Sequence, residues 1–277
     1  MPAVASSTTL RMMHRAIASA ELPCFASGTA WQLRLLGPPV LISAGAERTI
    51  ALRPKDAALL AIVALSGPIQ SDRLAAMLWP AATAKQADTS LRQRLFRLRR
   101  EAGAALVTSG SLLSLSPDLQ HDLASTLERI GADEQAGQHE LLGDLDFDDL
   151  PALADWLRAE RRRWRVRRDA ALSAAAAACE KNGAVARGLV YAQRLVDSEP
   201  LAEHAQRRLM RLHYLRGDRA AAIAAFERFE QCLKDEQGTR PSAETIELLD
   251  TIERGASALP ARRAVAPASL MRPPRLI

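Results

Sequence analysis

Long polar side chains recur on one face of the segment 85–101, KQADTSLRQRLFRLRRE. At 3.6 residues per turn its apolar residues fall on a single stripe, which indicates an amphipathic helix with one buried side. Amide, hydroxyl and guanidinium groups on the other side are the donors that reach base edges and phosphates in a DNA major groove. The predicted buried stripe is Ala87, Leu91, Leu95 and Leu98.

The charge of this segment favours an anionic partner. It has six basic and two acidic residues, so a helix there carries a net charge of +4. A basic helix taken alone is more often a solvated surface helix, and only the neighbouring elements decide between the two interpretations. If the helix reads DNA, we expect base contacts from Gln93, Arg97 and Arg100, on the side away from the apolar stripe.

Those neighbouring elements form a pattern typical of DNA-binding domains. A short helix, capped by Ser71 and ending before Pro80, precedes the basic helix, and a β-hairpin with its turn at Ser109 and Gly110 follows it. This order is a helix-turn-helix with a wing. Arg92, Arg94, Arg99 and the wing are expected to reach phosphates or the hairpin's own core. The complete predicted DNA-binding set is Gln86, Thr89, Arg92, Gln93, Arg94, Arg97, Arg100, Ser109 and Gly110.

Other elements complete a predicted domain over residues 30–120. Alternating apolar residues predict short strands at 31–36, 40–42 and 49–52. A helix is expected from Pro54, because proline suits the first helical turn, up to the Gly67-Pro68 break.

The charge of the chain is divided between its halves. The 277 residues suffice for about two domains, and 48% hydrophobic residues with 25% charged are ordinary for a globular protein. Residues 30–120 hold 11 basic and 6 acidic residues, a net charge of +5. Residues 121–257 hold 20 basic and 25 acidic residues, a net charge of −5. This division places a nucleic-acid contact in the front half only.

The back half is predicted to be helical over 121–256, with a tetratricopeptide-like repeat. Gly183 and Gly217 are 34 residues apart, and each is followed by a similar sequence that is predicted to be helical. This period is that of tetratricopeptide repeats, whose stacked helix pairs form a protein-contact groove. Second helices are expected at 201–215 and 241–252.

The arginine-rich helix predicted from Pro151 to Lys181 has two interpretations. Its mixture of arginine and tryptophan suits a second nucleic-acid surface. We favour a domain helix whose arginines pair with the acidic stretch 144–149 before it. A calcium loop at 144–148 lacks the glycine at position six and has Asp155 at position twelve, so we expect no metal site.

The remaining features concern the two ends of the chain, its location and the absence of enzyme motifs from its sequence. Residues 1–29 are expected to be a disordered leader, which resembles a transit peptide only in composition, and 257–277 a disordered basic tail or linker. Three distant cysteines favour reduced thiols in a cytosolic protein, and no apolar run is long enough for a membrane span. Phosphate-binding, zinc-protease and serine-hydrolase motifs are missing from the sequence, which indicates neither an enzyme nor a cofactor.

Several motifs together resemble SARP-type bacterial transcriptional regulators. In the front half these are LRLLG at 33–37, ALLAIVALSGP at 58–68, DRLAAMLWP at 72–80 and LRQRLFRLRR at 91–100. In the back half LLGDL at 141–145, DWLRAER at 155–161 and the run from 203 to 245 resemble the bacterial transcriptional activator domain. Gln237 departs from the family pattern, where an apolar residue is expected.

The resemblance implies a mainly α-helical protein with a small β component, a winged helix-turn-helix followed by an all-α, tetratricopeptide-like domain. It implies an activator that binds direct repeats in promoter DNA through the helix 85–101. The implied partners are double-stranded DNA, RNA polymerase holoenzyme and a second protomer on tandem sites. The implied location is the bacterial cytoplasm, on the nucleoid when the protein is bound to DNA. The alternative is a repeat-type adaptor whose winged helix binds protein, and a weaker one is a ligand sensor that uses the helical groove.

Overall fold

The structure is a computed structural model that describes residues 31–43, 48–109 and 112–255, without the side chain of Ser109. The predictions for 1–29, Gly110 and 257–277 lie outside the described residues. The chain divides into two compact units, the first made of residues 1–124 and 139–160, the second of 125–138 and 161–277. The expected boundary between residues 120 and 121 differs from this division, because residues 139–160 return to the first unit.

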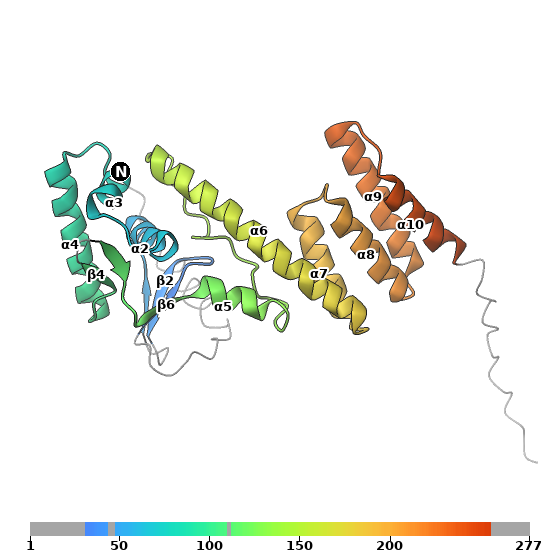
Figure 1. The fold of residues 1–277 in the computed structure, drawn as a ribbon, viewed down its shortest axis with the longest axis horizontal. Coiled ribbons are helices and arrows are strands. Elements are labelled where there is room, and N and C mark those ends of the chain that lie inside the picture. The colour runs from blue at the N-terminus through green and yellow to red at the C-terminus, as the bar shows by residue number, and fades with distance from the viewer. Residues whose placement is uncertain (1–30, 44–47, 110–111, 256–277) are drawn as a thin grey trace, which may run out of the picture. The chain divides into compact units, whose positions relative to one another are not determined.

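A four-stranded sheet forms one part of the first unit (Figure 1). Its strand order is β3-β2-β1-β6, in which β1 and β2, and β2 and β3, are antiparallel. β6 runs parallel to β1, with Leu119 opposite Trp31. β6 was not predicted from the sequence, because it is a three-residue strand formed by pairing with a distant segment. The strands are β1 (Trp31–Arg34), β2 (Val40–Ser43), β3 (Thr49–Ala51) and β6 (Leu119–His121).

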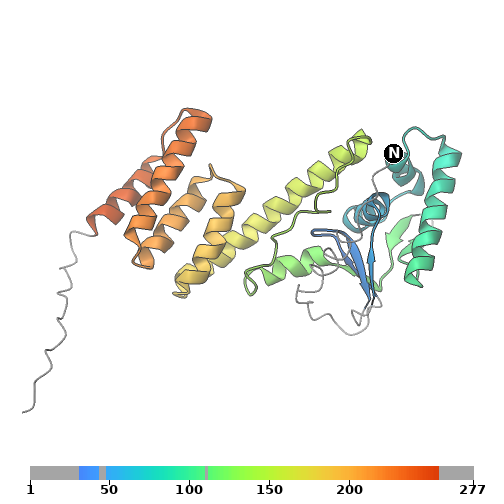
Figure 2. The ribbon, with the colours of Figure 1, turned by 180° about the vertical axis from the view of Figure 1, so that it is seen from behind.

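Three helices follow the first strands, and their core is α2. Every residue from 57 to 63 in this helix is at most 2% exposed. In both views α4 lies on the outer flank of this unit, with α3 and α2 beside it (Figures 1 and 2). Ser71 is the first residue of α3 and does not cap it; the cap position is Gln70, without a side-chain hydrogen bond. The helices are α2 (Pro54–Ser66), α3 (Ser71–Leu78) and α4 (Ala84–Ala102).

The predicted wing is present as a hairpin of β4 (Val107–Ser109) and β5 (Leu113–Leu115). It is fastened to the loop between α2 and α3, because the Leu113 N–H donates to the Ile69 carbonyl at 2.8 Å and the Ile69 N–H donates back at 2.9 Å. These two hydrogen bonds therefore hold the wing to the loop that precedes α3.

A buried carboxylate joins the start of α5 to the end of β1. Asp122 opens α5 (Asp122–Arg129) and accepts hydrogen bonds from the N–H groups of Leu35 at 2.9 Å and Leu36 at 3.1 Å. Burial raises the pKa of Asp122, against the lowering effect of these hydrogen bonds. The end of β1 is thus joined to the start of α5.

The second unit is a stack of helices, as the repeat predicts. α6 (Pro151–Lys181) has the predicted bounds, and its first ten residues belong to the first unit. Gly183 and Gly217 precede equivalent helices and share left-handed backbones, with φ of 72° and 83°, which glycine adopts without strain. Successive helices lie side by side (Figure 2). They are α7 (Val185–Ser198), α8 (Glu203–Leu215), α9 (Arg219–Gln237) and α10 (Ala243–Arg254).

Arginines bind the second unit together from within. Arg194 of α7 donates to the carbonyls of Glu134 and Ala136 at 2.9 and 2.8 Å, which fixes the connection that follows α5. Arg168 of α6 donates to Asp169 and to Ser198 of α7. In the part of α6 that belongs to the first unit, Arg158 pairs with Asp155. The expected pairing of the α6 arginines with the stretch 144–149 stays a prediction.

Candidate nucleic-acid interface

The first turn of α4 is held by a capping box. The Thr83 N–H donates to Gln86 Oε1 at 3.0 Å, and the Gln86 N–H points back to Thr83 Oγ1 at 3.4 Å. Reciprocal bonds of this kind satisfy two N–H groups that a helix start leaves unpaired. The side chain of Gln86, which the sequence assigns to DNA, therefore serves the helix end in this structure.

The inner flank of α4 is joined to α2 by a buried ion pair. Asp56 is 2% exposed. Its carboxylate accepts a hydrogen bond from Arg94 Nη1 at 2.8 Å, and Arg97 Nη2 lies 3.4 Å from both carboxylate oxygens. The Arg94 bond has the length of a charge-assisted hydrogen bond, whereas 3.4 Å is long for one. Arg94 thus carries most of this link, and Arg97 the weaker part.

Trp79 adds a second link between α4 and the rest of the unit. The Arg94 guanidinium lies over its ring at 5.7 Å from the centroid, and Lys55 Nζ lies over it at 5.8 Å. Lys55 also donates to the Leu78 carbonyl at 3.1 Å. Arg94 is consequently held by both a carboxylate and an aromatic face, which fixes the rotation of α4 about its axis.

The outer face of α4 collects the remaining donors. Within α4, which is described in full, no acidic residue is fully exposed; half-exposed Asp88 pairs with Arg92 at 2.9 Å. Thr89 returns its hydroxyl to the Lys85 carbonyl at 2.8 Å, which leaves its methyl group and the oxygen lone pairs outward. The exposed polar residues of this face are Lys85, Gln86, Thr89, Arg92, Gln93, Arg99 and Arg100.

Phe96 also lies on this face, and sequence reasoning missed it as a candidate. It is 67% exposed, more than any other large hydrophobic residue in the described part of the chain. Its spacing gave the signal: Phe96 follows Thr89 by seven residues and Arg92 by four, so it shares their side of the helix.

The nine predicted residues are therefore divided by the structure. Thr89, Arg92, Gln93 and Arg100 share the outer face, Gln86 lies at its start in the cap, and Arg94 and Arg97 turn inward to Asp56. Ser109 ends β4 with its side chain undescribed, and Gly110 lies outside the described residues. The wing strands are linked by the Thr108 and Ser114 hydroxyls at 2.7 Å.

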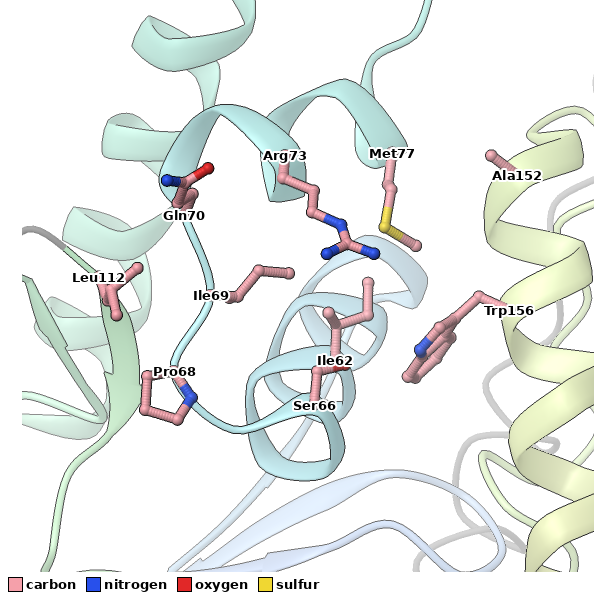
Figure 3. A pocket seen from close by; sticks show the side chains of 10 residues that line it. All are labelled: Ile62, Ser66, Pro68, Ile69, Gln70, Arg73, Met77, Leu112, Ala152 and Trp156. Carbon is pink, nitrogen blue, oxygen red and sulfur yellow. The ribbon is translucent and has the colours of Figure 1, made fainter.

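A cavity of 620 Å³ lies elsewhere in the first unit, between α2, α3 and the start of α6. Figure 3 shows Arg73 projecting into it above Ile62, opposite Trp156. None of its lining residues belongs to α4, and the lining contains no carboxylate, thiol or imidazole. It offers no acid–base pair for catalysis.

The described residues contain no group of three His, Cys, Asp or Glu side chains placed to hold a metal ion. None of their helices has the length and apolar character needed to cross a bilayer. Cys179 and Cys232 are free, and Cys24 lies outside the described residues.

Comparison with known proteins assigns part of the chain. Residues 140–253 match the family described as the bacterial transcriptional activator domain. Among solved structures the chain is similar to Mycobacterium tuberculosis EmbR in complex with a low affinity phosphopeptide, with 22% identity and a TM-score of 0.58. The likeness covers 82% of this chain and 66% of that one, so the chain spans about two thirds of the EmbR structure. No curated protein matches the sequence. The predicted fold class is confirmed.

Proposed function

We propose that the chain is a SARP-type transcriptional regulator and that it binds double-stranded DNA through α4. The match of residues 140–253 to the bacterial transcriptional activator domain and the similarity of the fold to EmbR support this proposal. In this proposal the outer face of α4 enters the major groove, and the wing of β4 and β5 lies against the sugar-phosphate backbone.

The observation that carries the proposal is the outer face of α4 itself. Its exposed polar side chains are donors, and the half-exposed carboxylate of Asp88 is neutralised by Arg92. Because the backbone of an anchored helix is already ordered, only the donor side chains lose conformational entropy when they bind a polyanion. Gln93 and Arg100 are the base-reading candidates, because amide and guanidinium groups make bidentate bonds to adenine and guanine.

Arg94 and Arg97 act differently in this proposal. Arg94 positions α4 through Asp56 and Trp79 and does not reach DNA. Arg97, whose contacts to Asp56 are 3.4 Å, stays within the contact set, because a guanidinium so weakly held can turn to a phosphate or base. Arg92 and Arg99 are proposed to bind phosphates.

The helical repeats of the second unit are proposed to make protein contacts. Stacked helix pairs present a groove, and here a cavity of 430 Å³ is lined by α7, α8 and α9 residues that include Val196, Leu209 and Phe229. We propose that this unit contacts RNA polymerase or a second protomer on promoter direct repeats, so that binding activates transcription.

The experiment is a fluorescence-anisotropy titration of the full chain. DNA from upstream of its own and neighbouring genes is compared with random DNA at two salt concentrations. Preferential binding that weakens steeply with salt, and is lost in the Gln93→Ala/Arg100→Ala double variant, supports the proposal. Weak binding that is equal for both DNAs contradicts it.

A protein-binding adaptor is the alternative, and the exposed aromatic ring of Phe96 favours it. Large exposed aromatic residues are typical of protein interfaces. A stable protein partner whose capture requires α4, together with absent DNA preference, would establish the adaptor.

A further inference from the structure

Phe96 occupies the centre of the outer face of α4. Residues three and four positions apart are neighbours on a helix surface. Four donors stand at those distances, Arg92 and Gln93 before Phe96, Arg99 and Arg100 after it, and all four are exposed. An apolar ring is thus surrounded by groups that bind phosphates and base edges.

The fold itself makes little use of this ring. Phe96 is 67% exposed, while the buried side of α4 is formed by Ala87, Leu91 and Leu98, on the other side of the helix. Exposing a phenylalanine to water costs free energy that a polar residue would avoid. We explain the exposed Phe96 by a partner that contacts the outer face of α4. The donors that surround Phe96 favour a polyanion as this partner.

In a major groove, one base presents an apolar group. The C5-methyl group of thymine projects into the groove, and phenylalanine is among the side chains that contact it. The amide of Gln93, one turn before Phe96, suits the N6 and N7 atoms of adenine in a neighbouring pair. We propose that Phe96 is a specificity-determining residue that contacts a thymine methyl group, so that the chain selects sites with a thymine opposite the centre of α4.

This inference rests on the proposed DNA-binding function, and it can be tested separately from it. The full chain first selects its preferred sites from a random double-stranded DNA library. Each thymine of the selected site is then replaced in turn by deoxyuridine, which removes the methyl group and keeps base pairing.

The wild-type chain is expected to lose affinity about fourfold at one thymine, the loss that corresponds to about one buried methyl group. Phe96→Ala is expected to bind the thymine and deoxyuridine sites with equal affinity. Val166→Ala is the matched control, since Val166 is 64% exposed on α6, and it should keep the wild-type discrimination.

A melting curve of each variant accompanies the titrations. Alanine is the strongest helix former, so an exposed Phe96→Ala substitution should leave α4 folded. Arg100→Ala serves as a second variant, expected to weaken binding while it keeps the thymine preference.

The outcomes separate the two proposals. Selection of a DNA site, with discrimination of thymine that vanishes only in Phe96→Ala, supports the inference. Selection of a site with no sensitivity to any methyl group, or with equal sensitivity in Phe96→Ala, overturns it and leaves DNA binding intact. Failure to select any site overturns the DNA-binding proposal and this inference with it.

Discussion

A buried carboxylate on α2 holds two of the arginines that sequence spacing assigns to DNA. Asp56 accepts from Arg94 at 2.8 Å and lies 3.4 Å from Arg97, so both guanidinium groups bear on the inner flank of α4. A buried ion pair adds little net stability when both partners are present, but removal of one partner leaves a charge in a poorly solvated place. Asp56 is thereby a residue that orients α4.

We predict that Asp56→Ala destabilises the protein by about 3–5 kcal/mol, the usual cost of breaking a buried pair. Urea denaturation of the full chain measures it. Asp88→Ala is the matched control, because its pair with exposed Arg92 is worth about 0.3–0.5 kcal/mol. Similar losses in both variants would show that Asp56 does not hold α4.

Substitutions of residues that read bases should affect DNA affinity differently from substitutions of residues that bind phosphates. Gln93→Ala or Arg100→Ala is predicted to cost about 1–3 kcal/mol on the selected site and little on random DNA. Arg99→Ala is predicted to weaken both, and to reduce the salt dependence of log K by about 0.9. Titrations at several salt concentrations distinguish the two classes, and an identical profile for all three variants would contradict the assignment.

At the scale of elements, a carboxylate joins the start of α8 to the start of α10. Glu203 accepts hydrogen bonds from the N–H and hydroxyl of Ser242 and from the hydroxyl of Thr245, and it pairs with Arg207. Partial burial acts to raise the pKa of Glu203, but the hydrogen bonds from Ser242 and Thr245 outweigh it, so the pKa lies below its usual value.

The stability that this junction contributes should therefore depend on pH. A carboxyl group whose pKa is lower in the folded than in the unfolded protein stabilises the fold fully at pH values above its unfolded pKa, about 4.3. This stabilisation is lost as the pH falls through the pKa of the folded state. We predict that Glu203→Gln lowers the Tm at pH 7, and that the difference from wild type vanishes in acid. Melting curves between pH 7 and 3 test this; a difference independent of pH would contradict it.

At the scale of the whole molecule, charge is divided along the sequence and not between the two structural units. Residues 30–120 carry a net charge of +5 and residues 121–257 a net charge of −5. Residues 139–160, with seven acidic residues and one basic residue, nevertheless belong to the same unit as the basic helix α4. The positive charge is therefore a local property of α4 and not of its whole unit.

If protomers associate on tandem sites, binding should depend on the helical phase of the DNA. Two copies of the selected site about 10.5 base pairs apart present the same face. We predict that the full chain binds this pair about tenfold more tightly per protomer than one site, a coupling of about 1.4 kcal/mol. Gel-shift titrations measure it, with five added base pairs as the control. Unchanged coupling with the added half turn would argue against contact between protomers.

The sequence alone determined the elements whose signals are local. The bounds of α6, the basic helix at 85–101 and the 34-residue period that begins at Gly183 follow from helical periodicity and from proline and glycine at their ends. These patterns depend on neighbours within a few positions, so they can be read from the chain. The resemblance of the back half to the bacterial transcriptional activator domain is confirmed for residues 140–253, and the fold of the chain is similar to that of EmbR.

Only the tertiary structure decided how the candidate site is divided. Arg94 and Arg97 meet Asp56 across 38 and 41 residues of chain, and β6 pairs with β1 across 88 residues, with Leu119 opposite Trp31. Helical spacing sets the angle of a side chain about its own helix and carries no information on which distant group it meets. The contacts of Arg94 with Asp56 and Trp79, which keep its guanidinium group away from the outer face of α4, were therefore decided by the tertiary structure.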